Sequence, residues 1–114
     1  MTLIVHTSQL GHLVPDGLDI TRTGGLGFPF APSLGLLRRY PTNGTDRDWL
    51  NFAEGYISEM RDSFKGEKQA WVNLLALPRV VLLCGCSEAP RCHRTILAQQ
   101  ILPKLGAKYA GEIV

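Results

Sequence analysis

The sequence predicts an α/β protein with a small three-layer fold, Rossmann-like or flavodoxin-like, around a mainly parallel central sheet. Short apolar runs that suit strands stand near both ends of the chain, two amphipathic helices fill its middle, and a strand, a loop and a helix follow. At 114 residues the chain can bury a core without disulfides or metal. We expect a single domain over residues 1–114.

Two strands are predicted in the N-terminal part of the chain. The run TLIVH, residues 2–6, is β-branched and apolar, and VPDGLDIT, residues 14–21, repeats this character after a turn signal. We expect both to be buried strands. The next segment, TGGLGFPFAP at residues 23–32, holds too much Gly and Pro for a helix or a central strand, so it predicts a loop of defined shape.

Two helices are predicted in the middle of the chain. The first begins at the capping-box-like sequence TDRD, and the second extends from Glu67 to Leu77, before Pro78. Because their aromatic side chains follow the helical packing period, we expect these in the core rather than in a binding site. The apolar face of the first helix consists of Trp49, Ala53, Tyr56, Ile57, Met60 and Phe64.

The C-terminal third predicts a strand, a loop and a helix, followed by one more strand. VVLLC, residues 80–84, is a continuous apolar run that is typical of a strand buried on both faces. CHRTILAQQIL, residues 92–102, predicts a helix that packs back on this strand, and the tail AKYAGEIV can add a last short strand.

Composition and charge exclude several classes of protein. Hydrophobic residues make up 45% and charged residues 19%, which argues against a long disordered segment. The chain shows no basic and apolar leader and no run of about 18 apolar residues, so we expect a cytoplasmic protein with no membrane partner. A net charge of +2 and scattered Lys and Arg residues give little support for a nucleic-acid partner.

All three cysteines lie in one segment, VVLLCGCSEAPRCHR, together with one histidine and two arginines. An odd number of cysteines, two of them only two positions apart, does not suit a secreted disulfide framework, so we expect reduced thiols. Ligands of parallel sheets bind beyond the carboxyl ends of the strands, in loops of this kind. The segment therefore predicts a ligand site.

The helix start predicted at Cys92 favours a negatively charged ligand. Free backbone N–H groups and the helix dipole attract an anion there, and Arg91 and Arg94 add positive charge. The same field lowers the pKa of a thiol at this place, which makes Cys92 or Cys86 a candidate nucleophile, and His93 a candidate acid or base. We expect a phosphate- or nucleotide-like ligand, with Arg94 as its main partner.

Two other interpretations of the cysteines stay open. The first is a zinc site built from ligands within ten residues, although the spacing lacks C-x-x-C pairs and adjacent helical residues project about 100° apart. The second is a non-enzymatic binding module whose thiols only pack in the core, as we expect for Cys84. We expect no cofactor, with zinc as the alternative. The possible ligands are Cys84, Cys86, Cys92 and His93.

A second polar segment follows the second predicted strand. Asp19, Thr21, Arg22 and Thr23 precede Gly24, Gly25 and Gly27, glycines that allow a close approach to the backbone. The alternative is a plain Gly-rich turn with a surface arginine. The sequence GGLG in this segment is not a dinucleotide-binding fingerprint, because the third glycine and the following helix are missing. We expect this segment to form the other half of the ligand site.

The stretches LLCGCSEAPRCHRTILAQQI and LDITRTGG, the latter followed by FAPSLGLL, resemble the family called domain of unknown function 488 (DUF488), in particular its small bacterial and phage-like members. The resemblance covers Leu18 to Leu102. It implies an α/β fold of the three-layer type, in which the Cys-His-Arg loop and the Asp-x-x-Arg strand end form a shared polar cleft. It implies no reaction. The family signature falls on Cys84, Cys92, His93 and Arg94.

This chain departs from the family pattern at one position of that loop. Many members carry a glutamate where this chain has Cys86, which argues against a mechanism based on a carboxylate here. Glu88 is close enough in the sequence to be a substitute.

Overall fold

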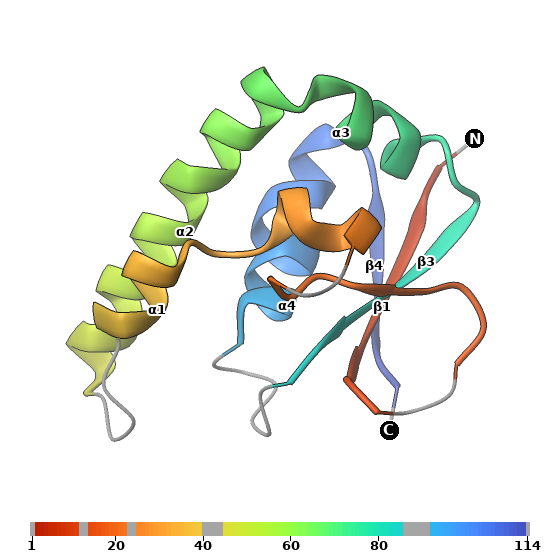
Figure 1. Cartoon of the computed structure of the whole chain (residues 1–114). Coiled ribbons are helices and arrows are strands. Elements are labelled where there is room, and N and C mark those ends of the chain that lie inside the picture. Colours follow the sequence, from red (N-terminus) through yellow and green to blue (C-terminus); the bar gives the residue numbers. More distant parts are fainter. Residues whose placement is uncertain (1, 12–13, 23–24, 40–44, 86–91, 114) are drawn as a thin grey trace.

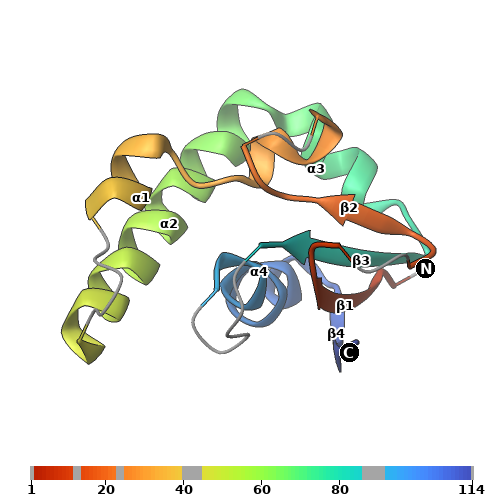
Figure 2. The same ribbon diagram turned by 60° about the horizontal axis from the view of Figure 1, so that its bottom comes forward.

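The fold is built on a four-stranded parallel sheet (Figure 1). The structure is a computed structural model that describes residues 2–11, 14–22, 25–39, 45–85 and 92–113. The strand order is β2-β3-β1-β4, which Figure 2 shows from top to bottom, and all neighbouring strands are parallel. The expected α/β class with a Rossmann-like parallel sheet is confirmed. The strands are β1 (Ile4–Gln9), β2 (Gly17–Asp19), β3 (Arg79–Cys84) and β4 (Lys108–Glu112).

The helices connect the strands. The chain segment between β2 and β3 forms η1 (Gly25–Phe30), α1 (Leu34–Arg39), α2 (Asp46–Gly66) and α3 (Lys68–Leu75). The segment between β3 and β4 is helical over α4 (His93–Ile96), the π-helix η3 (Leu97–Ile101) and the 3₁₀ helix η4 (Leu102–Leu105). The two predicted middle helices and the C-terminal helix are therefore confirmed. The 3₁₀ helix η1 lies within the Gly- and Pro-rich segment that we expected to be a loop, and α1 was not predicted.

Helix α2 begins as its sequence predicts. The Thr45 hydroxyl accepts a hydrogen bond from the Asp48 backbone N–H at 3.2 Å, and the Asp48 carboxylate accepts one from the Thr45 backbone N–H at 2.9 Å. This is a complete capping box, which satisfies two otherwise unpaired donors at the helix start. The buried face of α2 consists of Phe52, Ala53, Tyr56 and Met60.

Helices α2 and α4 lie on the same face of the sheet. The rings of Tyr56 in α2 and His93 in α4 are 5.6 Å apart, and both helices share one core cluster with Val80 and Leu82 of β3. Figure 1 shows α4 between α2 and β4. The connections from β2 to β3 and from β3 to β4 cross the sheet in the same direction, so right-handed crossovers place both on one face. The described helices thus form one layer, where the sequence predicted layers on both faces.

The aromatic side chains of the middle helices pack in the core or against it: Phe52, Tyr56 and Trp71 are buried, as predicted for Tyr56 and Trp71, whereas Trp49 and Phe64 are half-buried. Trp71 is 1% exposed and packs edge-on against Phe30 and Phe64. The buried Tyr56 hydroxyl donates a hydrogen bond to the Phe30 carbonyl at 2.7 Å, and burial raises the pKa of Tyr56 well above its usual value. These contacts attach η1 to α2.

The strand at one edge of the sheet differs from the expectation of burial. β2 pairs only with β3, and its three residues are exposed or half-buried. An edge strand has one neighbour, so less of its surface is covered.

None of the described helices is both long and apolar enough to cross a membrane.

Candidate functional site

The carboxyl ends of the strands bring Asp19, one of the predicted site residues, to the same edge of the sheet as Cys84 and Glu112. Cys84 is the last residue of β3 and pairs with Gln9, the last of β1. Asp19 ends β2 beside Leu83, and Glu112 ends β4 beside Thr7. Because all strands are parallel, these ends share one edge, where ligands of such sheets bind.

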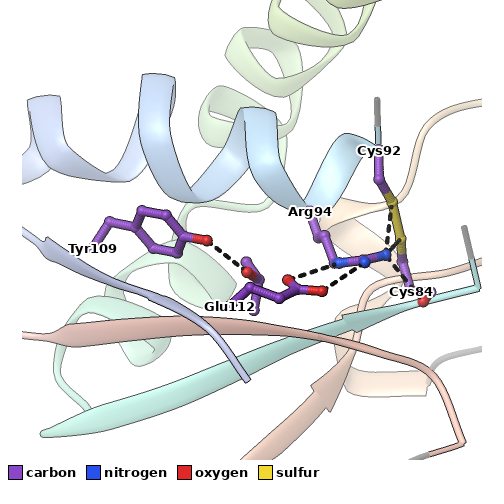
Figure 3. A network of polar contacts seen from close by, with 6 residues as sticks. Cys84, Cys92, Arg94, Tyr109 and Glu112 are labelled. Carbon is purple, nitrogen blue, oxygen red and sulfur yellow. Dashed lines mark hydrogen bonds and ion pairs between the residues drawn. A yellow bond between two sulfur atoms is a disulfide. The ribbon is translucent and has the colours of Figure 1, made fainter. Parts of the chain in front are cut away.

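Cys84 and Cys92 are joined by a disulfide (Figure 3). Cys92 stands immediately before α4 with an extended backbone, φ −136° and ψ 147°. The disulfide places Cys92 next to the carboxyl end of β3, where both cysteines are buried. The expectation of reduced thiols is wrong for this pair, because sequence spacing did not reveal that the helix start folds back over Cys84. The expectation that Cys84 is a core residue is confirmed.

Arg94 is buried and paired with a carboxylate. Its side chain is 1% exposed, and its Nη2 and Nε atoms donate to the two Glu112 oxygens at 2.8 and 3.2 Å (Figure 3). A bidentate pair of this kind compensates a charge that would otherwise be costly to bury. Arg94 therefore links α4 to the end of β4.

The same guanidinium contacts the disulfide. Its Nη1 atom lies 3.2 Å from the Cys84 sulfur, 3.3 Å from the Cys92 sulfur and 3.4 Å from the Cys84 carbonyl oxygen. One arginine thus connects β3, β4 and the start of α4. The anion-binding role that the sequence suggested for Arg94 stays a prediction, and the contacts described here give it a positioning role.

His93 connects the Cys-His-Arg segment to the end of β2. Its Nε2 atom is 2.9 Å from the Ile20 carbonyl oxygen, which can only accept, so Nε2 carries the proton. Burial lowers the pKa of His93, and Arg94 lowers it further, whereas the Ile20 hydrogen bond and Asp19 act in the opposite direction. The neutral ring leaves Nδ1 unprotonated and able to accept a proton.

The segment after β2 has its own local hydrogen bonds. One oxygen of the Asp19 carboxylate accepts from the Thr21 backbone N–H at 2.9 Å and from the Thr21 hydroxyl at 2.6 Å. Gly25 has a left-handed backbone, φ 63°, which favours glycine. Arg22 is exposed, and its guanidinium lies 5.6 Å from the centre of the Phe28 ring.

A family model matches residues 29–105, which is more than half of the chain; its description is active DUF488-N3 subclade, DUF488-N3a. The chain belongs to the DUF488 family. The resemblance that we stated from the Cys-His-Arg signature is thereby confirmed. No curated protein and no solved structure matches the chain.

The family match covers only one side of the proposed site in this DUF488 protein. Residues 92–94 lie inside the matched range, and residues 19–25 lie outside it. Three predicted site residues, Cys86, Arg91 and Gly24, lie outside the described residues. The ligand-binding or catalytic roles of all the predicted site residues stay predictions.

Sequence reasoning missed Glu112 and Phe28 of this DUF488 protein. Glu112 is an acidic residue at the carboxyl end of a parallel strand, so the rule that drew attention to Cys84 also applies to it. At Gly27 a Cβ atom would overlap the Asp19 carbonyl group, so only glycine lets η1 approach β2 here. No local pattern distinguishes this glycine from its neighbours Gly24 and Gly25.

A metal centre fits the described residues poorly. Cys84, Cys92 and His93 are buried, and their potential ligand atoms lie within 4.8 Å of one another, a donor set that suits zinc. The Arg94 guanidinium, however, already contacts both sulfurs, and its positive charge opposes a second cation. The two sulfurs are also bonded to each other. We therefore do not favour the zinc interpretation.

Proposed function

We propose that this DUF488 protein binds a small anionic, nucleotide-like ligand at the carboxyl edge of the sheet and acts on it as a thiol enzyme. The contact between the Arg94 guanidinium and both sulfur atoms, at 3.2 and 3.3 Å, carries the proposal. A positive charge at this place stabilises a thiolate once the disulfide is reduced. The description of the matched subclade as active supports an enzyme.

The dithiol is the working form in this proposal. Two molecules of a small thiol supply the two electrons that open the Cys84–Cys92 bond and are themselves oxidised to one disulfide, RSSR. The Cys92 thiolate then forms a bond to an electrophilic atom of the ligand, and a leaving group departs with the bonding electrons. The unprotonated Nδ1 of His93, next to Cys92 in the chain, is the candidate acceptor for the thiol proton.

Arg22 and Phe28 support a nucleotide-like ligand. Arg22 makes no ion pair with another described residue, and its partner Phe28 is 49% exposed. An arginine suits a phosphate group, and an exposed aromatic ring offers a stacking surface for a base. Since Arg22 follows Ile20 by two residues, the His93–Ile20 hydrogen bond holds this pair near the Cys-His-Arg segment.

A nucleotide screen by thermal shift and calorimetry, with and without dithiothreitol, tests the ligand. We expect at least one nucleotide to raise the melting temperature, and Arg22→Ala to weaken its binding about tenfold, the loss of one charge-assisted contact. Arg47→Ala, which removes an exposed arginine of α2, is the matched control and leaves binding unchanged. If no nucleotide or phosphate stabilises either redox form, the ligand assignment is wrong.

Alkylation by iodoacetamide tests the thiol. In the reduced Cys84→Ser/Cys86→Ser variant, Cys92 is the only thiol, and we expect it to react at pH 7 faster than cysteine in a short peptide. Adding Arg94→Lys keeps a positive charge but removes Nη1, the atom that contacts the Cys92 sulfur, so the rate decreases. A slow Cys92 that is insensitive to Arg94, or one zinc per chain in the reduced wild type, would contradict the thiol enzyme.

A further inference from the structure

A hollow opens between α2 and the helical segment η3–η4. Its volume is about 320 Å³, within the range of roughly 300–1,000 Å³ that is common for small-molecule pockets. Gln100, on its rim, follows His93 by seven residues, so at helical rise it lies about 10 Å along the segment from that histidine. The pocket is thus separate from the Cys-His-Arg segment. Its apolar wall consists of Ile57, Met60, Phe64, Trp71, Ile101 and Leu105.

An irregular helix shapes one side of this pocket. The Leu102 backbone N–H donates to the Leu97 carbonyl, five residues earlier, so the turn is wider than an α-helical one. It carries Gln100 and Ile101 to the pocket wall, and η4 follows with Lys104. Single π-turns inside helices occur frequently at functional sites.

The rim of the pocket is positively charged. Arg61 and Lys65 stand one turn apart on α2, and Lys104 lines the pocket from η4. No acidic side chain is among the described residues that line it, and none of these three cations is in an ion pair with another described residue. Lys68 adds a positive charge nearby, with its Nζ atom 5.9 Å from the centre of the Phe64 ring. Like charges around an apolar hollow repel one another, and a bound anion relieves this repulsion.

We propose that this pocket binds a small amphiphilic anion, an acyl or aryl carboxylate of medium size. The apolar part packs on Phe64, Ile101 and Leu105, and the carboxylate lies between Lys65 and Lys104. A nucleotide fits less well, because its sugar and base edges need several uncharged polar side chains as hydrogen-bond partners. Among the described lining residues, Gln100 is the sole side chain of this kind. The site is independent of the function proposed for the sheet edge.

Titration with decanoate tests the pocket. Trp71 lines the hollow, so in the Trp49→Phe variant all tryptophan emission reports on it. We expect a saturable change in emission with a Kd on the order of 100 μM, as suits a ligand of this size. Decyltrimethylammonium, which has the same chain length and the opposite charge, binds at least tenfold more weakly, and butyrate does not bind.

Charge reversal separates the pocket from the overall charge of the protein. The Lys65→Glu/Lys104→Glu change, made in the same background, weakens decanoate binding at least tenfold. Arg47→Glu/Lys108→Glu alters the net charge equally at exposed positions outside the pocket and leaves binding unchanged. All four side chains are exposed, and far-UV circular dichroism verifies that each variant is folded.

Three results of the titrations would overturn the proposal, and one result of light scattering would replace it. They are no saturable binding of decanoate at millimolar concentration, equal affinity for decyltrimethylammonium, or equal weakening by both double variants. Light scattering that shows a dimer broken by Leu105→Asp would assign the pocket to a second copy of the chain instead. A negative nucleotide screen leaves the decanoate titration unaffected, so the two proposals fail separately.

Discussion

Two arginines follow the ends of neighbouring strands and occupy opposite environments. Arg94, after β3, is 1% exposed and bonds to Glu112 and both sulfurs, whereas Arg22, after β2, is exposed and lies against the Phe28 ring. The buried guanidinium is fully engaged within the protein, and the exposed one has capacity left for an anion. The comparison teaches that the Cys-His-Arg segment links β3, β4 and the residue after β2 through Arg94 and His93, while Arg22 is accessible to solvent. In the function that we propose, the Asp19–Arg22 segment is the side that meets the ligand.

The energetic cost of a buried charge explains this division. An arginine without water needs a partner for its charge and for its donors, and Glu112 and the sulfur atoms provide them. Once these contacts are made, a ligand anion that displaced Glu112 from Arg94 would only replace the ion pair that is lost, with no net gain in free energy. Arg22 has no such partner to lose among the described residues.

The largest expected effect belongs to the buried side of the comparison. Glu112→Gln leaves the Arg94 charge buried without a counter-charge, and we expect the free energy of unfolding to decrease by about 3 kcal/mol. Urea denaturation measures this. Glu54→Gln, at an exposed position of α2, is the control and changes stability by less than about 0.5 kcal/mol. Equal stability of both variants would show that the ion pair does not hold the site.

A somewhat smaller effect is expected where η1 meets the end of β2. In Gly27→Ala the new methyl group overlaps the Asp19 carbonyl, and the backbone must shift, at a cost of about 2 kcal/mol. Gly66→Ala is the matched control, because its Cβ atom meets nothing within 4 Å. Thermal unfolding measures the stability of both variants. A Gly27→Ala protein as stable as Gly66→Ala would refute the close approach of Gly27 to the Asp19 carbonyl group.

The pH dependence of stability tests the link that His93 makes between the Cys-His-Arg segment and the Asp19–Arg22 segment. Burial holds the pKa of His93 below its ordinary value of about 6.5, so the unfolded chain binds a proton before the folded one does. The stability that neutral His93 contributes is therefore lost as the pH decreases below roughly 6.5. We expect urea midpoints measured from pH 7.5 to 5.0 to decrease more steeply for the wild type than for His93→Gln. A steeper decrease for the variant would contradict this assignment.

The smallest effect on stability is expected at the exposed arginine. Arg22→Ala removes a surface contact with Phe28, and we expect the free energy of unfolding to change by less than about 0.5 kcal/mol. Urea denaturation alongside Glu112→Gln checks this directly. A loss as large as that of Glu112→Gln would mean that both arginines are structural and would remove the difference between the two segments.

Apart from η1 and α1, the order of the elements could be predicted from the sequence, and so could the location of the candidate site. The periodicity of α2, the capping box at Thr45 and the apolar run of β3 are properties of neighbouring residues. The rule for parallel strands then places Asp19 and Cys84 at one edge, as the structure has them. The family signature around His93 was also readable from the sequence.

The tertiary structure alone decided how these residues pair. The Arg94–Glu112 ion pair, the Cys84–Cys92 bond and the His93–Ile20 hydrogen bond join residues 18, 8 and 73 positions apart. Such pairs depend on strand order and on the direction of the crossovers, which leave no local pattern in the chain. The same reason applies to the single helical layer and to the cationic pocket between α2 and η4, whose cations come from segments about 40 residues apart. Local chemistry determined which residues are candidates for a ligand site, and long-range packing decided which of them are already paired with other residues of the protein.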